Sequence, residues 1–298
     1  MPTAFFLHNV DAEPLYELLR DDPEFGDVKD YVEQLWITFH DDDDDHNLAD
    51  KNFQSKAPKA FHQHFWEMYL GSTLRTKGME LKRIGGEGLE YYIKMEDGRR
   101  LWVEAVAPTA GSGQNSVPPF ASGQHLTEQL AEVPVKAILL RFTSVFRSKL
   151  DAYHKAVKKG IVKQGEQFVL AINARAIPDW PLHTDLPLFL KALLPIGPQV
   201  FHISADATTT DQPTHLKRER IHTGAGAPVS TMGLLENDAI PLAAVLHSEV
   251  NALNHPAQLG DDFDALLNPR ATPSLPADYF AWARRRYRWD SGVLTVVP

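Results

Sequence analysis

The feature that most constrains the fold is a short turn between two strand-like segments. Residues 89–95 and 99–107 are rich in apolar, aromatic and β-branched side chains, and the tripeptide 96–98, Glu-Asp-Gly, separates them. Three-residue hairpin loops commonly end on a residue in the left-handed conformation, which glycine adopts most readily. The sequence therefore predicts an antiparallel hairpin in which Met95 faces Arg99.

This register brings two carboxylates to opposite positions on neighbouring strands. Tyr91 faces Val103 on one side of the hairpin, and Glu90 faces Glu104 on the other. Directly opposed Cβ atoms lie about 5 Å apart, and like charges at this separation are destabilising without compensation. A divalent cation with oxygen ligands would compensate them, which favours magnesium or manganese. We therefore predict that Glu90 and Glu104 are metal ligands.

Alternatives remain open for both acids. A two-residue turn at 97–98 would move Glu104 to the opposite face from Glu90. Glu90 alone is typical of an exposed strand end. Because Glu104 lies in an apolar run where a lone charge is costly to bury, a structural salt bridge with Arg141 or Lys149 would also explain it.

A well-marked helix precedes the hairpin. Pro58 suits the first turn of a helix, apolar side chains recur at helical spacing up to Lys77, and Gly78 provides a stop. Glu67 lies in this helix on a face with small neighbours, which would allow close approach to a sheet. Glu67 is therefore a third candidate acid, and the alternative is an ordinary exposed helix glutamate.

The remaining sequence alternates helix-like and strand-like segments, which predicts an α/β fold with a mixed β-sheet flanked by helices. We assign residues 1–50 to a helical N-terminal extension with an acidic loop, and residues 51–298 to an α/β domain with C-terminal elaborations. We expect helices at 14–20 and 28–36, a solvated acidic loop at 41–45, strands at 135–142 and 167–172 with a basic helix at 145–159 between them, and further strands and helices over 199–204, 241–250 and 262–267.

Composition narrows the chemistry. The 298-residue chain has net charge −9 and no cysteine. Thiolate nucleophiles and zinc–thiolate sites are therefore excluded, and a metal would need carboxylate, imidazole or carbonyl ligands. His62 and His64 diverge by roughly 200° on a helix, so they cannot share a metal. No segment approaches the roughly 20 apolar residues that span a bilayer. We expect a cytoplasmic protein that does not bind membranes.

The order of the candidate acids resembles a known nuclease superfamily. A glutamate in a helix (Glu67), an acid that opens a hairpin (Glu90) and a second acid in its next strand (Glu104) resemble the PD-(D/E)XK restriction-endonuclease-like nucleases, over roughly residues 58–175. The segment 102–108 also looks like bacterial proteins of this type. The resemblance implies a restriction-endonuclease-like core and Mg- or Mn-dependent hydrolysis of DNA. In that superfamily the two hairpin acids would hold the metal, and the helical glutamate would help to position metal and water.

The sequence departs from the superfamily pattern at two positions. Glu90 stands where aspartate is usual, and its longer side chain could still reach a metal. Val106 stands where a lysine usually follows the second acid by two residues. Some members carry this lysine on the following helix, so Lys149 is our candidate for the cation that stabilises the developing negative charge. Lys149 could equally be one of several solvated cations on that helix.

The leading hypothesis is a magnesium-dependent endonuclease that acts on DNA. With net charge −9, DNA binding would require a localised basic face. Candidate phosphate contacts are the basic clusters 149–163, 217–220 and 284–288, although each is also typical of solvated surface. One alternative is a catalytically silent nuclease-like fold that acts as a nucleic-acid-binding or protein-interaction module. Another is a glycoside hydrolase that uses a carboxylate pair. Whether the chain forms a homo-oligomer is left open.

Overall fold

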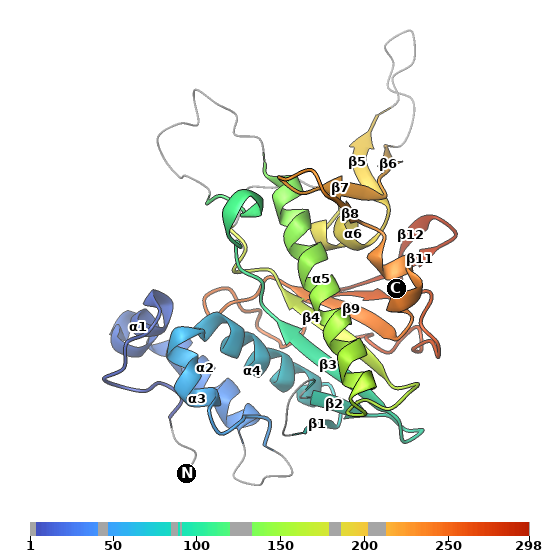
Figure 1. The fold of residues 1–298 in the computed structure, drawn as a ribbon. Helices are drawn as coiled ribbons and strands as arrows, with labels where there is room; N and C mark the ends of the chain where they lie inside the picture. The colour runs from blue at the N-terminus through green and yellow to red at the C-terminus, as the bar shows by residue number, and fades with distance from the viewer. Residues whose placement is uncertain are drawn as a thin grey trace, which may run out of the picture. The chain divides into compact units, whose positions relative to one another are not determined.

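The chain forms two compact units of interleaved sequence, and its fold is drawn in Figure 1. The structure is a computed structural model that describes residues 4–40, 47–84, 89, 91–119, 133–178, 186–201 and 213–297. Unit 1 comprises Met1–Ala107, Lys149–Ala176 and Pro241–Pro298, and unit 2 comprises Pro108–Ser148 and Ile177–Ile240. Residues 1–50 lie in unit 1, and the segment 51–298 contributes to both units.

Unit 1 is built on an eight-stranded mixed sheet. The neighbouring pairs β3–β4, β4–β9 and β10–β11 are parallel, and the other neighbouring pairs are antiparallel. The predicted mixed α/β architecture is thus confirmed. In order across the sheet the strands are β1 (Leu81–Arg83), β2 (Tyr91–Lys94), β3 (Arg100–Val106), β4 (Gln167–Asn173), β9 (Leu242–Ser248), β10 (Asp264–Leu267), β11 (Arg285–Asp290) and β12 (Val293–Val297).

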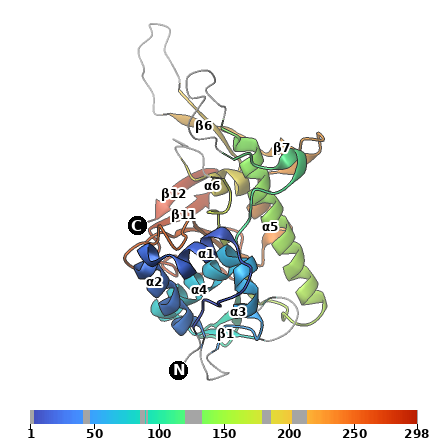
Figure 2. The ribbon, with the colours of Figure 1, turned by 90° about the vertical axis from the view of Figure 1, so that its left-hand side faces the viewer.

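Helices flank this sheet. Figures 1 and 2 show α1 to α4 gathered together on one side of it, where Trp66 of α4 is fully buried and donates from Nε1 to the Ala171 carbonyl of β4 at 3.2 Å. On the other side, the ring of Tyr153 of α5 stacks on Phe168 with centroids 4.5 Å apart. The helices are α1 (Pro14–Asp21), α2 (Gly26–Phe39), α3 (Phe53–Lys56), α4 (Phe61–Thr76) and α5 (Val135–Lys158), with 3₁₀ turns at Pro23–Phe25 and Ala57–Lys59.

The hairpin has the predicted register. Tyr91 lies opposite Val103, and Met95 N–H donates to the Arg99 carbonyl at 2.9 Å. Gly98 has φ +81°, the left-handed conformation that the third loop position requires. The three-residue loop is confirmed, and the two-residue alternative is wrong.

The predicted strand over 135–142 is wrong, because this segment is the first part of α5. A short apolar run fits a buried strand and a buried helix equally well when it is considered alone. The helical period becomes visible only when the run is joined to the predicted basic helix at 145–159. Buried side chains then recur every three or four residues, at Leu139, Phe142, Phe146, Leu150 and Tyr153.

Unit 2 carries the smaller elements. Its two-stranded sheets pair β5 with β6 and β7 with β8, and Arg147 of α5 binds Glu236 and Asp238 at 2.5 and 2.6 Å. Its further elements are α6 (Leu188–Leu193), β5 (Ile196–Val200), β6 (Thr214–Lys217), β7 (Arg220–His222), β8 (Pro228–Ser230) and 3₁₀ turns at Gly113–Asn115, Gly233–Leu235 and Asn237–Ala239.

Two sequence expectations fall partly or wholly outside the described residues. The strand expected at 199–204 overlaps the end of β5, but 202–204 are not described, and neither is the acidic run 41–45. Among the helices that the structure describes, none combines the length and apolar character needed to cross a bilayer.

Candidate active site

An open pocket of about 380 Å³ in unit 1 brings together three of the four predicted site residues. Glu67 comes from α4, Glu104 from β3 and Lys149 from α5. The fourth residue, Glu90, lies outside the described residues. The complete lining is Asp50, Phe53, Lys56, Gln63, His64, Glu67, Tyr91, Val103, Glu104, Ala105 and Lys149.

Glu104 and Lys149 form an ion pair at this pocket, joining Oε1 of the glutamate to Nζ of the lysine. The Glu104 side chain is 16% exposed and that of Lys149 is 28% exposed, so water only partly screens the pair. Of the two salt bridges proposed from the sequence, the one with Lys149 is therefore confirmed. Arg141 instead donates from Nε to the Thr109 carbonyl at 2.9 Å.

Lys149 is therefore not simply one of several solvated cations on its helix. Its ammonium contacts Glu104 of β3. The same strand carries Val106, which stands where the resembled superfamily usually has a lysine. A cation on a neighbouring helix and an acid on the strand are thus in contact, although they lie 45 positions apart in the sequence. This contact places a positive charge beside a carboxylate at the edge of an open pocket.

Hydrogen bonds from Gln63 and Tyr91 hold the Glu67 carboxylate. Gln63 donates from Nε2 to Oε1 at 2.8 Å, and the Tyr91 hydroxyl donates to Oε2 at 3.2 Å. Gln63 also accepts from the Ala107 N–H at 2.8 Å and donates to the Ala105 carbonyl at 3.3 Å. The carboxylate is thereby fixed relative to the end of β3.

Sequence reasoning missed Gln63 and Tyr91. Gln63 lies four residues before Glu67, and helical residues at this spacing are neighbours on one face, so the sequence contained a signal for that contact. The contact between the Tyr91 hydroxyl and Glu67 has no local signal, because it requires the hairpin to pack against α4.

The other wall of the pocket carries a further pair of charges. Asp50 and Lys56 approach to 3.7 Å. His64 of α4 faces α3: its Nδ1 lies 2.8 Å from the Ala60 carbonyl, and its ring is edge-on to that of Phe53. Burial lowers the pKa of His64, so this imidazole is neutral at neutral pH. The described lining therefore holds three carboxylates and two lysines.

The donor chemistry of the pocket suits a hard divalent cation. Its candidate ligands are carboxylate and carbonyl oxygens, which magnesium and manganese prefer. Glu104 would hold such a cation through its carboxylate, which Lys149 also contacts. Within the described ranges, no group of three or more histidine, aspartate or glutamate side chains is arranged to hold a metal. The predicted partner ligand, Glu90, is not among those residues.

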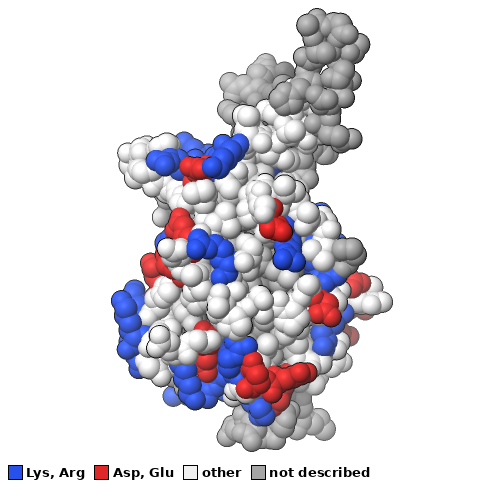
Figure 3. Space-filling model, turned by 90° about the vertical axis from the view of Figure 1, so that its right-hand side faces the viewer, with Lys and Arg blue, Asp and Glu red and all other residues white. Residues whose placement is uncertain are grey.

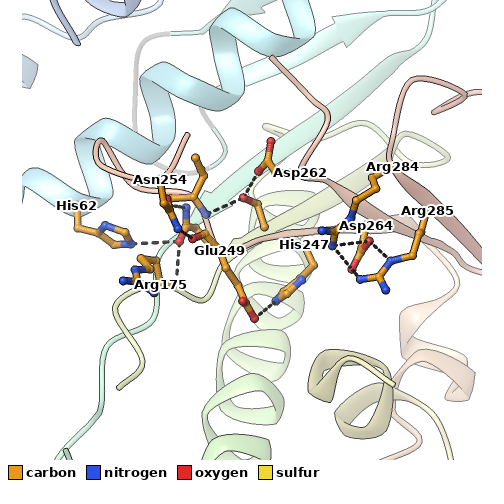
Figure 4. Close-up of polar contacts among 12 residues, drawn as sticks. His62, Arg175, His247, Glu249, Asn254, Asp262, Asp264, Arg284 and Arg285 are labelled. Carbon is orange, nitrogen blue, oxygen red and sulfur yellow. Dashed lines mark hydrogen bonds and ion pairs between the residues drawn. The ribbon is translucent and has the colours of Figure 1, made fainter. Parts of the chain in front are cut away.

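A second polar region lies across the carboxyl ends of β4 and β9 (Figure 4). His62 contacts Asn173 at 3.1 Å, while Asp264 accepts from Arg284 and Arg285. Burial lowers the pKa of His62. Asp262 accepts hydrogen bonds from Tyr69 and Ser248. His62 and His64 thus have different partners, and the region is tied together by its own hydrogen bonds.

The basic cluster 284–288 is partly exposed but engaged in contacts within the protein: the Arg284 and Arg285 side chains are 51% and 41% exposed, whereas Arg286 is buried. It forms most of β11, which the sequence analysis did not predict. Arg284 and Arg285 bind the buried Asp264, and Arg286 donates to the Ala277 carbonyl at 2.8 Å. These arginines are already engaged, which makes them poor candidates for phosphate contacts.

On the face drawn in Figure 3, lysine and arginine side chains occur in separate groups with acidic side chains beside them, so the coloured residues form no continuous basic surface there.

Comparison with known proteins gives no relative. Searches against protein-family models, curated proteins and solved structures find no match to this chain.

Proposed function

We propose that this protein is a divalent-metal-dependent nuclease whose site is formed by Glu67, Glu90, Glu104 and Lys149. The observation that carries the proposal is the meeting of Glu67, Glu104 and Lys149 in one open pocket, although they come from a helix, a strand and a second helix. Their meeting in one pocket supports the proposal, because the resembled pattern requires these three residues to lie close together.

The order of elements around the pocket supports a restriction-endonuclease-like core. Helix α4 precedes the antiparallel pair β2–β3, and α5 then connects β3 to β4, its parallel neighbour. Glu67 and Glu104 occupy the helical and second-strand positions of the resembled pattern. Lys149 occupies the following helix, as in those members of the superfamily that relocate the lysine.

The proposed reaction is hydrolysis of a DNA phosphodiester bond. A water oxygen bonds to phosphorus and loses a proton while the bond from phosphorus to the leaving oxygen breaks, and the leaving oxygen takes up a proton, so that no proton is gained or lost overall. When bound, the divalent cation supplies a Lewis acid that offsets negative charge on the phosphate. Glu104 and Glu90 would hold that cation. Glu67, oriented by Gln63 and Tyr91, would align water, and Lys149 would stabilise charge that develops on the phosphate oxygens.

The test is cleavage of plasmid and linear DNA in Mg²⁺ or Mn²⁺ by wild type and by Glu104→Gln. We expect wild type to cleave and the variant to lose most activity, with both proteins retaining the same unfolding midpoint in urea. Glu80→Gln is the matched control, because Glu80 pairs with Lys82 on an exposed surface at 3.3 Å. Equal cleavage by wild type and Glu104→Gln would refute the proposal.

A catalytically silent binding module is the second candidate. The Glu104–Lys149 pair favours it, because each charge already compensates the other without a metal. This candidate predicts DNA or protein binding that is unaffected by EDTA, with no cleavage under any metal. Metal-dependent cleavage that is lost in Glu104→Gln would eliminate it.

A further inference from the structure

We propose that Lys56 is a substrate-positioning residue that binds a backbone phosphate next to the scissile one. This inference rests on the proposed nuclease function and adds a contact outside the predicted catalytic set. Lys56 is the last residue of α3 and lines the same pocket as Glu104 and Lys149. The pocket therefore presents lysines from two separate helices, and both could contact phosphates of one bound DNA strand.

The Lys56 ammonium is tethered loosely. Its ion pair with Asp50 spans 3.7 Å, whereas a charge-assisted hydrogen bond is about 2.7–2.9 Å long. The Lys56 side chain is 59% exposed. Asp50, in contrast, is fixed by its own turn, since its Oδ1 accepts from the Asn52 N–H at 2.7 Å. An incoming phosphate can therefore recruit Lys56 while Asp50 stays in place.

The helix that carries Lys56 is anchored to the core. Phe53, one turn earlier, is 4% exposed and packs against Phe39 and Trp36 with ring centroids 4.9 and 5.8 Å apart. Ala57 immediately after Lys56 is fully buried. Lys56 thus projects from a rigid support, which reduces the ordering cost of holding its charge at the pocket.

The charge balance of the pocket explains why a second lysine matters. The described lining carries Asp50, Glu67 and Glu104 against Lys56 and Lys149, and His64 is neutral, so its net charge is −1. With Glu90 as the second proposed ligand, a bound divalent cation would make the loaded pocket neutral. Without Lys56 the same loaded pocket would be negative, and it would repel a phosphate.

The experiment measures the salt dependence of binding to a short, phosphorothioate-substituted single strand, which keeps its charges and resists cleavage, in Mg²⁺. Each phosphate contact contributes about 0.7 to the slope of log K against log salt for a single strand. We expect Lys56→Ala to reduce the slope by about this amount and Lys56→Arg to restore it. On unmodified DNA, Lys56→Ala should raise KM and leave kcat nearly unchanged.

Lys59→Ala is the matched control. Lys59 lies three residues further on, is 61% exposed, pairs with Asp11 and does not line the pocket. If wild type cleaves DNA and Lys56→Ala and Lys59→Ala have the same slope and KM, the Lys56 inference is overturned while the nuclease proposal stands. If wild type neither binds nor cleaves DNA, both are overturned.

Discussion

Glu104 and Asp264 are acids of the same sheet, and each contacts cationic side chains, but their surroundings differ. Asp264 is 2% exposed and both of its oxygens accept from Arg284 and Arg285 at 2.6 to 3.3 Å. Glu104 is 16% exposed, contacts one lysine through one oxygen, and borders an open pocket. The comparison teaches that pairing by itself does not mark a functional acid.

What separates the two acids is the capacity to take another partner. A carboxylate whose two oxygens are filled by two guanidinium groups can exchange a partner only by breaking strong, oriented hydrogen bonds. A carboxylate with a single ion pair beside water can exchange it at modest cost. We therefore expect Asp264 to stabilise the fold, and Glu104 to be the acid that can accept a further partner.

Replacement of Lys149 should have the largest effect on activity. We expect Lys149→Met to lower kcat/KM about 10³-fold, because it removes the cation that would stabilise the reacting phosphate. The free energy of unfolding should change by no more than about 1 kcal/mol, since water in the pocket can solvate Glu104. Steady-state cleavage and urea unfolding measure the two quantities.

The control for Lys149→Met is Lys155→Met, because Lys155 is exposed on the same helix. If Lys149→Met had normal kcat/KM but a large loss of stability, the Glu104–Lys149 pair would have a structural role, like the pairs of Asp264 with Arg284 and Arg285.

Asp264→Asn should produce the opposite pattern. Breaking a buried ion pair by removing one partner costs about 3 kcal/mol, so we expect a loss of this size in the free energy of unfolding. The kcat/KM of the folded protein should be unchanged. Glu219→Gln, which disrupts an exposed pair with Lys217, should alter stability little. A fall in kcat/KM without destabilisation would show that the Asp264 region takes part in the reaction.

Gln63→Ala should have a smaller effect on activity. Gln63 orients Glu67 and joins it to the end of β3, so its loss should reduce kcat/KM about tenfold, or about 1.4 kcal/mol. Because Gln63 would act through Glu67, the double variant with Glu67→Gln should be no worse than Glu67→Gln alone. Gln34→Ala, at an exposed position of α2, is the control. Additive losses would contradict this positioning role.

The sequence predicted those parts of the fold that depend on local rules. The Glu-Asp-Gly turn predicted the hairpin register, because a three-residue loop places Gly98 at its last, left-handed position. A two-residue Asp-Gly turn was the alternative, and the observed pairing of the strands decides between them. Glu104 was singled out from the hairpin register and Glu67 from its position in a helix, whereas Lys149 was proposed from the resemblance to the nuclease superfamily. Whether they act in catalysis stays a prediction, as does the role of Glu90.

The parts that could not be predicted depend on contacts distant in sequence. Asp50 and Lys56 join the pocket only because α3 packs through Phe53 against α2. The arginines at 284 and 285 resemble a solvated surface until their pairing with Asp264 of the neighbouring strand is known. No local pattern specifies either contact.

The pH dependence of stability should give the smallest effect and a further test of the Asp264 region. His247 lies opposite Asp264 in the sheet, and burial lowers its pKa from 6.5 to about 4. Between these pH values the unfolded chain binds a proton that the native imidazole does not. The free energy of unfolding should therefore fall as the pH drops below 6.5, by at most about 1.4 kcal/mol per pH unit. Urea titrations should show a shallower decline for His247→Asn, with exposed His8→Asn behaving as wild type. Coincident slopes for wild type and His247→Asn would mean that this histidine is protonated in the native state and that the region is open to water.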